Sequence, residues 1–197
     1  EIPLKPELIE GVLREGHKMM IAGPSKAGKS FSLIELATCI SYGLPWMGRF
    51  NCKSGKVLYI NMELDPNSCR NRFYRVQEAM EILDKVPAFP CHVWNLRGHV
   101  VPMDKLTKIT IRRYRHSGYA AIIIDPIYKV LTGSENNAYD MAQFCNYFDR
   151  ISTECNCAVI YCHHHSKGDQ SWKRSMDRAS GSGVFARDVD ALLDMTE

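Results

Sequence analysis

The amino-acid sequence predicts an α/β domain whose mostly parallel, twisted sheet is covered by helices on both faces. The first observation is that apolar runs alternate with segments of helical periodicity along the chain. The second is that several of these runs are continuously apolar, which is typical of strands buried on both faces. The third is a glycine-rich loop, GPSKAGKS at 23–30, between the first such run and the first helical segment. Parallel strands need long crossovers, and the helical segments supply them.

Length and composition favour a single globular domain over residues 1–197. The chain has 45% hydrophobic and 24% charged residues, and its net charge of +3 permits nucleic-acid contact without arguing for it. No apolar stretch approaches the roughly 20 residues that span a bilayer, and no secretory signal opens the chain. We therefore expect a cytoplasmic protein with no membrane contact and with reduced, buried cysteines. Because the chain begins with Glu1 instead of methionine, we also expect it to be excised from a longer one.

The first elements alternate between strand and helix. KMMIAG at 18–23 is a predicted strand, and apolar residues at helical spacing over 29–42 predict a helix that Gly43 ends. KVLYINME at 56–63 is the next strand, with an acid at its carboxyl end. In the segment LDP that follows, Asp65 is the candidate N-cap and the proline the first residue of a second helix.

The second half of the chain continues the alternation. CHVWNL at 91–96 is a predicted strand, and 104–116 is a basic amphipathic helix whose cations we expect on a solvated face. AAIIID at 120–125 is apolar and β-branched throughout, as a doubly buried strand should be. A helix is predicted from about 138 to 154. The last two predicted strands are AVIYCH at 158–163 and DALLDM at 190–195.

Residues typical of ligand-binding sites stand at the carboxyl ends of the predicted strands. Gly23, Glu63, Asp125 and the run His163–His165 all occupy such positions. Open parallel sheets bind their ligands outside the carboxyl ends of the strands. These residues are therefore expected to meet at one edge of the sheet, and that convergence is stronger evidence for a site than any single motif.

The loop after the first strand fits the pattern G-x-x-x-x-G-K-[ST]. Its glycines let the backbone curl so that successive N–H groups point inward, and the helix that follows adds partial positive charge. Lys29 can reach the β- and γ-phosphates of a nucleotide, and the Ser30 hydroxyl can bind Mg²⁺. The predicted phosphate-binding residues are Gly23, Pro24, Ser25, Lys26, Ala27, Gly28, Lys29 and Ser30.

Other signatures narrow the class of nucleotide-binding protein. The guanine-specific pattern N-K-x-D and the transporter signature L-S-G-G-Q are both absent from the chain. The arginine cluster that comes closest to the lid of a nucleotide kinase, RNRFYR at 70–75, has a helical pattern and is a poor match to it. A small-molecule phosphotransferase stays open as an alternative, although no acceptor pocket is recognisable.

The ordered set of motifs resembles the RepA-type branch of RecA-like P-loop ATPases, which occur in plasmid, phage and mobile-element proteins. The resemblance covers nearly the whole chain. It is carried by LIEGVLREGHKMMIAGPSKAGKSF, GLPWMG, GKVLYINMELDP, AIIIDPIYKV, ENN, CHHHSKG and ASGSGVFARDVDALL, in that order.

This resemblance implies Mg²⁺-dependent hydrolysis of ATP. Ser30 would bind Mg²⁺ directly, and Asp125, the Walker B acid, would hold it through water. Glu63 matches the catalytic glutamate that orients the attacking water. His164, with His163 as the second choice, matches a γ-phosphate sensor. A zinc site at the histidine run is the less favoured reading, because Cys155, Cys157 and Cys162 are expected to pack around or within a buried strand.

The resemblance also implies contacts with the base. Phe31, directly after the loop, is expected to contact the nucleotide. Arg72 resembles the family arginine that lies near the adenine, and Arg70 and Arg75 are alternatives for that role.

Family members of the helicase type form hexameric rings on single-stranded DNA. We therefore expect a homo-oligomer and a DNA partner. The polar loop KGDQSWKRSMDR at 167–178 is expected to face the central channel or the neighbouring subunit, and a merely solvated loop is the alternative. The position of the arginine finger, which one subunit delivers to its neighbour, falls near Asp190 here. This is a departure from the pattern, for which Arg187 or Arg178 would substitute. The alternative is a non-motor ATPase switch or loader that controls a protein partner.

Overall fold

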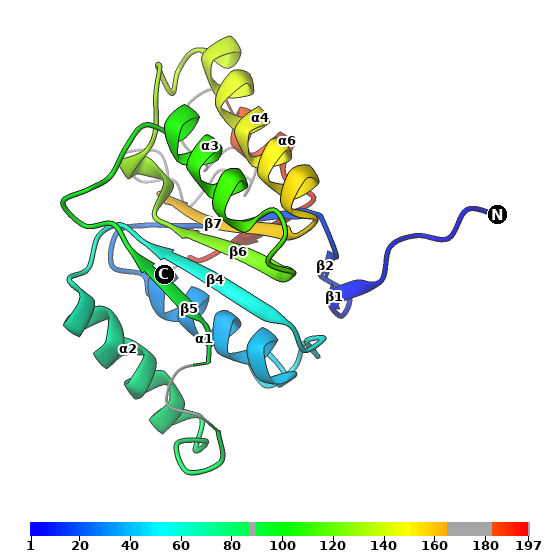
Figure 1. Cartoon of the computed structure of the whole chain (residues 1–197), viewed down its shortest axis with the longest axis vertical. Helices are drawn as coiled ribbons and strands as arrows, with labels where there is room; N and C mark the ends of the chain where they lie inside the picture. The colour runs from blue at the N-terminus through cyan, green and yellow to red at the C-terminus, as the bar shows by residue number, and fades with distance from the viewer. Residues whose placement is uncertain (87–89, 165–182, 197) are drawn as a thin grey trace.

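A computed structural model, which describes residues 1–86, 90–164 and 183–196, contains a six-stranded parallel sheet (Figure 1). Its strand order is β5-β4-β6-β7-β3-β8, and every neighbouring pair is parallel. The strands are β3 Lys18–Gly23, β4 Lys56–Asn61, β5 His92–Asn95, β6 Tyr119–Asp125, β7 Ala158–His164 and β8 Ala191–Asp194. The predicted α/β class is confirmed.

Helices cover both faces of the sheet, as predicted. Helices α1 and α2 pack on one face, and α3, α4 and α6 pack on the other. A two-stranded antiparallel hairpin of β1 Glu7–Ile9 and β2 Leu13–Arg14 precedes the sheet, and a 3-10 turn, η1 Ile127–Lys129, follows β6. The helices are α1 Lys29–Tyr42, α2 Pro66–Ala79, α3 Met103–Tyr114, α4 Ala138–Cys155 and α6 Val184–Asp188.

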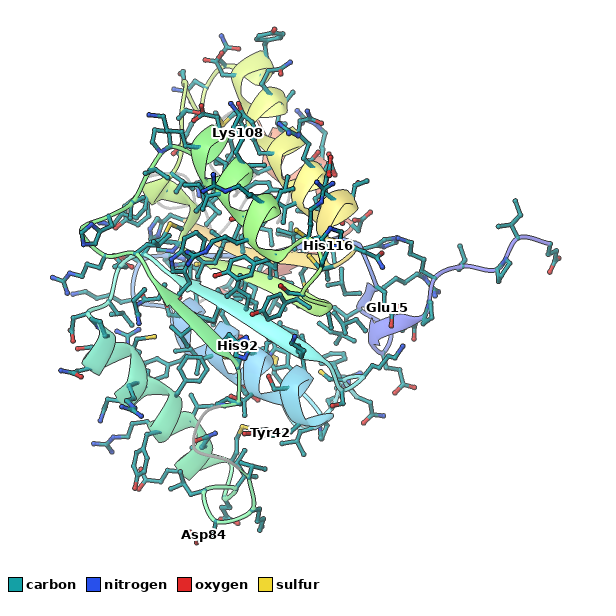
Figure 2. The ribbon with its side chains drawn as sticks, in the orientation of Figure 1. Glu15, Tyr42, Asp84, His92, Lys108 and His116 are labelled. Atoms are coloured by element: carbon teal, nitrogen blue, oxygen red, sulfur yellow. The ribbon has the colours of Figure 1, made fainter. Side chains whose placement is uncertain are left out.

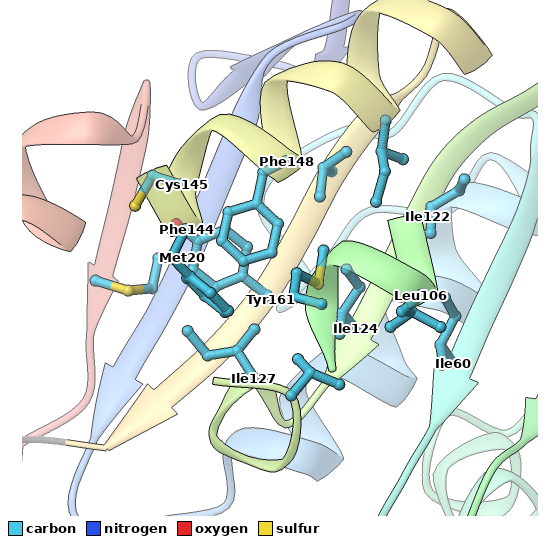
Figure 3. Packing of buried hydrophobic residues seen from close by; sticks show 14 of the residues in the cluster. Met20, Ile60, Leu106, Ile122, Ile124, Ile127, Phe144, Cys145, Phe148 and Tyr161 are labelled. Carbon is cyan, nitrogen blue, oxygen red and sulfur yellow. The ribbon is translucent and has the colours of Figure 1, made fainter. Parts of the chain in front are cut away.

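Alternate residues of the central strands feed two separate cores. In β6, Ile122 and Ile124 pack towards α3 and α4, whereas Ala121 and Ile123 pack towards α1 and α2. All four side chains are fully buried. Figure 3 shows the first of these cores, in which aromatic residues of α4 and β7 lie over the strands. Burial on both faces explains why these strands are continuously apolar in sequence.

The predicted helix boundaries agree closely with the structure. The Asp65 carboxylate caps α2 by accepting hydrogen bonds from the backbone N–H groups of Asn67 and Ser68, both at 3.0 Å. Helix α1 ends at Gly43, whose φ of 67° is the left-handed conformation that glycine adopts without strain. Helix α3 buries its apolar side and leaves cations such as Lys108 exposed (Figure 2).

Some elements differ from the expectation. The strand predicted over 56–63 ends at Asn61, so Glu63 lies on the turn after it. The hairpin near the N-terminus, the turn η1 and helix α6 have no counterpart in the prediction. The two strands of the hairpin, the turn and the helix are each five residues or shorter, too short to show a hydrophobic period.

The structure also describes the cysteines and the hydrophobicity of the helices, about which the composition gave expectations. All eight cysteines are buried free thiols, as predicted. Among the described residues, no helix has both the length and the apolar character that a membrane span requires.

Candidate nucleotide-binding site

The strand order brings the predicted site residues together at the carboxyl edge of the sheet. Gly23, the last residue of β3, pairs in register with His164, the last residue of β7. Asp125 ends β6 and pairs in register with Asn61, which ends β4. Glu63 follows two residues later. Because β4, β6, β7 and β3 are neighbours in that order, the convergence expected from the sequence is present in the structure.

The loop 23–30 has the backbone of a phosphate-binding loop. Gly28 has φ 89° and Lys26 has φ 66°, so the chain turns through left-handed conformations before α1 begins. A Cβ atom on Gly23 would lie 3.1 Å from the Cβ of Met195, so glycine also permits close packing there. The first N–H groups of α1 have no acceptor within the helix, so an anion beside the loop would be stabilised there.

Lys29 is buried at the base of the loop. Its Nζ donates hydrogen bonds to the carbonyl oxygens of Gly23, at 2.9 Å, and Pro24, at 2.5 Å. Burial lowers the pKa of Lys29 below its ordinary value, while the nearby Cys162, Asp125 and Glu63 act in the opposite direction. The ammonium group is thus held next to the loop by neutral carbonyl groups, which a phosphate can replace as partners.

Asp125 lies at the centre of a hydrogen-bond network. Its Oδ1 accepts from the Ser30 hydroxyl at 3.2 Å and from the Cys162 thiol at 3.0 Å, and its Oδ2 accepts from the Tyr59 hydroxyl. Burial, followed by the charge of Asp125, raises the pKa values of Tyr59 and Cys162, so both remain protonated donors.

The pairing of Ser30 with Asp125 fits Mg²⁺. This cation prefers hydroxyl, carboxylate and water oxygens, and Ser30 and Asp125 place a hydroxyl and a carboxylate within 3.2 Å of each other beside the loop. These are the two residues that the sequence assigned to the metal.

Glu63 and His164 flank a tyrosine that the sequence analysis did not select. The Tyr128 hydroxyl donates to Glu63 Oε1 at 2.9 Å, and the Tyr128 ring lies 5.3 Å from the His164 ring, centroid to centroid. Burial and then Lys29 lower the pKa of His164, which favours the neutral imidazole expected of a sensor. His163, the second choice, points into the core against Phe185, so His164 is the better placed of the two.

Tyr59, Cys162 and Tyr128 are the site residues that sequence reasoning missed as such. For Cys162, the sequence predicts only that the thiol packs inside the strand. The signal available in the sequence was proximity to predicted site residues: Tyr59 lies four residues before Glu63, and Tyr128 lies three residues after Asp125. Their polar groups gave no periodic pattern, because their partners lie on other elements of the fold.

Arg72 on α2 lies beside Phe31, the residue that follows the loop 23–30. Its Cζ lies 4.9 Å from the centre of the Phe31 ring, and Phe31 itself is 45% exposed at the start of α1. Arg75 pairs with Glu78 on the same helix at 3.8 Å instead. The contact with Phe31 thus places Arg72 beside the predicted nucleotide-contacting residue.

Arg187 is not at the carboxyl edge. It is exposed on α6, and the next residue, Asp188, binds Lys18 at the start of β3, the opposite end of that strand from the loop. The predicted DNA-facing loop 167–178, with the alternative Arg178, lies outside the described residues.

Comparisons with known proteins agree with this geometry. The family model described as AAA domain matches residues 1–170. The structure is also similar to the crystal structure of the flagellar accessory protein FlaH from Methanocaldococcus jannaschii, with a TM-score of 0.57 and 16% sequence identity over 91% of this chain and 71% of that one. At that identity the likeness concerns the fold alone. The chain therefore belongs to the AAA domain family and has the RecA-like P-loop fold that its sequence predicted.

Proposed function

We propose that this chain is a Mg²⁺-dependent ATPase that binds ATP at the loop 23–30 and hydrolyses it to ADP and phosphate. The observation that carries the proposal is the hydrogen bond from Ser30 to Asp125 beside the buried Lys29. Phosphoryl transfer to water needs cations and donors at the phosphates and an acceptor for the water. The carboxyl edge of this sheet holds candidates for each part.

Each residue has a distinct part in the proposed reaction. The loop N–H groups and Lys29 bind the phosphates, and Ser30 and Asp125 would hold Mg²⁺, which when bound neutralises charge on the phosphate oxygens. Glu63 is exposed at the edge of the sheet. The Tyr128 hydroxyl donates to its Oε1, which leaves Oε2 for another partner. That oxygen can accept a hydrogen bond from the attacking water and orient it.

Two substitutions separate binding from turnover. Glu63→Gln removes the acceptor charge but preserves size, so it should retain ATP binding and lose nearly all hydrolysis. Lys29→Ala should lose binding itself, measured by titration with a fluorescent ATP analogue. If Glu63→Gln releases phosphate at the parent rate, Glu63 does not position the water.

The finer assignment within this proposal is the ATPase domain of a replication or mobile-element helicase that acts as a hexameric ring on single-stranded DNA. Its support is the ordered resemblance in sequence, together with the exposed position of Arg187 on α6, from which we propose that it contacts a neighbouring subunit. Mass measurement with a non-hydrolysable ATP analogue tests the ring, because a monomer at high concentration contradicts it.

The effect of DNA on hydrolysis tests the motor. Strong stimulation of the ATPase rate by single-stranded DNA supports a helicase. A rate that does not respond to DNA would favour the switch or loader, in which the nucleotide state controls a protein partner. Phosphate transferred to an acceptor other than water would instead identify a phosphotransferase.

A further inference from the structure

Tyr128 lies between two residues of the proposed reaction. Glu63 follows β4 and His164 ends β7, while Tyr128 belongs to the turn that follows β6, the strand between them. Its hydroxyl reaches Glu63 Oε1 at 2.9 Å, and its ring meets the His164 imidazole at 5.3 Å with a tilt of 43°. The Tyr128 side chain therefore contacts both Glu63 and His164.

The turn that carries Tyr128 is held in place by its neighbours. Ile127 is fully buried in the core beneath α3 and α4 (Figure 3). The Val130 N–H donates to the Ile127 carbonyl at 3.0 Å, and the Val130 carbonyl accepts from the Met103 N–H at the start of α3, at 3.2 Å. The backbone beside Tyr128 is thus fastened to both core and helix, and the Tyr128 side chain, which is 37% exposed, extends from this fixed turn to Glu63 and His164.

Glu63 needs such a partner. It is an exposed glutamate beyond the end of its strand, and a long side chain in that setting samples several rotamers. A hydroxyl that donates to Oε1 selects one orientation and leaves Oε2 available for water. Burial and the adjacent Glu63 raise the pKa of Tyr128 to about 12, so the phenol donates throughout the neutral range.

We propose that Tyr128 is a positioning residue: its hydroxyl holds Glu63 in the orientation that receives the attacking water, and its ring couples that orientation to His164. A phosphate that engages His164 would shift or restrain the ring packed against it. The hydroxyl of the same ring would pass that change to Glu63. This inference rests on the proposed ATPase function, and it adds a link between sensing and water activation.

The hydroxyl and the ring can be removed separately. Tyr128→Phe keeps the ring and loses only the donor, so kcat should fall about tenfold, as expected for a lost hydrogen bond to a charged group, with KM for ATP changed less than about twofold. In a Glu63→Asp background, whose shorter carboxylate no longer reaches the phenol, the same substitution should cause no further loss. Tyr139→Phe, at a position that is 71% exposed on α4, is the matched control.

The coupling has a readout that does not depend on turnover. Tyr128→Leu removes the ring, so the preference for ATP over ADP, measured by competition against a fluorescent nucleotide, should decrease severalfold. Tyr128→Phe should retain the parent preference. An unchanged preference in Tyr128→Leu overturns the coupling to His164.

The outcomes also separate this inference from the proposed function. A Tyr128→Phe enzyme with kcat within twofold of the parent, or with equal losses in the parent and Glu63→Asp backgrounds, overturns the positioning role. If Glu63→Gln is inactive in that case, the ATPase proposal stands while the Tyr128 inference falls. If Glu63→Gln turns over normally, both fall.

Discussion

The hydrogen bond from Tyr59 to Asp125 offers a direct test of how the metal-binding acid is held. Tyr59 and Asp125 are 1% and 5% exposed, and the Tyr59 hydroxyl donates to Asp125 Oδ2. Tyr59→Phe removes the donor and leaves a buried carboxylate with one partner fewer. Because the Tyr59 ring also packs edge-on against Phe73, with centroids 5.4 Å apart, the phenylalanine should keep the apolar contacts.

The magnitude follows from the charge of the acceptor. A hydrogen bond to a charged group contributes about 1.5–3 kcal/mol, so a loss of about 2 kcal/mol in the free energy of unfolding is expected. For a chain of this size, that loss lowers the melting temperature by about 4–8 °C. The same substitution loosens Asp125, so more Mg²⁺ should be needed for half-maximal binding of an ATP analogue.

Thermal unfolding and Mg²⁺ titration of the purified variant provide both readouts. Tyr74→Phe on α2 is the control, since Tyr74 is 50% exposed and a surface change of this kind shifts stability by less than about 0.5 kcal/mol. A Tyr59→Phe melting temperature equal to that of the parent would show that the hydroxyl does not stabilise Asp125.

Three further predictions concern charged and aromatic groups. Burial alone would lower the pKa of Lys18, but its hydrogen bonds to Asp149 and Asp188 raise the pKa above 10.5. The charged Lys18 therefore stabilises the folded state at lower pH, and this contribution to the free energy of unfolding should be lost as the pH rises through the pKa of Lys18 in the folded protein. Urea unfolding at pH 9 and 11 should show this loss in the parent and not in Lys18→Met, which is itself destabilised by about 1–2 kcal/mol because the two acids keep partial solvent contact. Burial lowers the pKa of His163 to about 4, so between pH 6.5 and about 4 the unfolded state binds a proton that the folded state does not. The free energy of unfolding should therefore fall as the pH is lowered through this range. His163→Asn should reduce the dependence of the free energy of unfolding on pH, and an equal dependence in parent and variant would refute the prediction. Arg72→Ala should raise the Kd for ATP about two- to fivefold if the guanidinium and the Phe31 ring stack beside the base, and isothermal titration that finds no change would exclude the contact.

The elements that the sequence predicted well are those whose signal is local. The strand 18–23 and the helix 29–42 were placed to the residue, because a doubly buried strand and a glycine-bounded helix both leave clear patterns. The loop between them has a fixed spacing, and the predicted strand and helix flank it in the structure. Asp125 was predictable for the same reason, as the acid that closes an apolar run.

The contacts that complete the site could not be predicted in this way. Cys162 and Tyr59 reach Asp125 from different strands, and which strands neighbour β6 depends on the sheet order. Tyr128 depends in addition on a three-residue turn with no period of its own. Such contacts are set by tertiary packing, which a single sequence does not encode in its local pattern.

The two-sided burial of the central strands has a consequence for evolutionary divergence. A core of this kind requires apolar side chains of about the right volume, and it accepts many combinations of them. Sequence can therefore drift through β3, β6 and β7 while the backbone path is retained, which accounts for a fold shared with FlaH at 16% identity. Few residues can replace Gly28, because its backbone conformation excludes most side chains. A common ancestor should therefore be easier to recognise in the sequence of the loop 23–30 than in the sequences of the central strands.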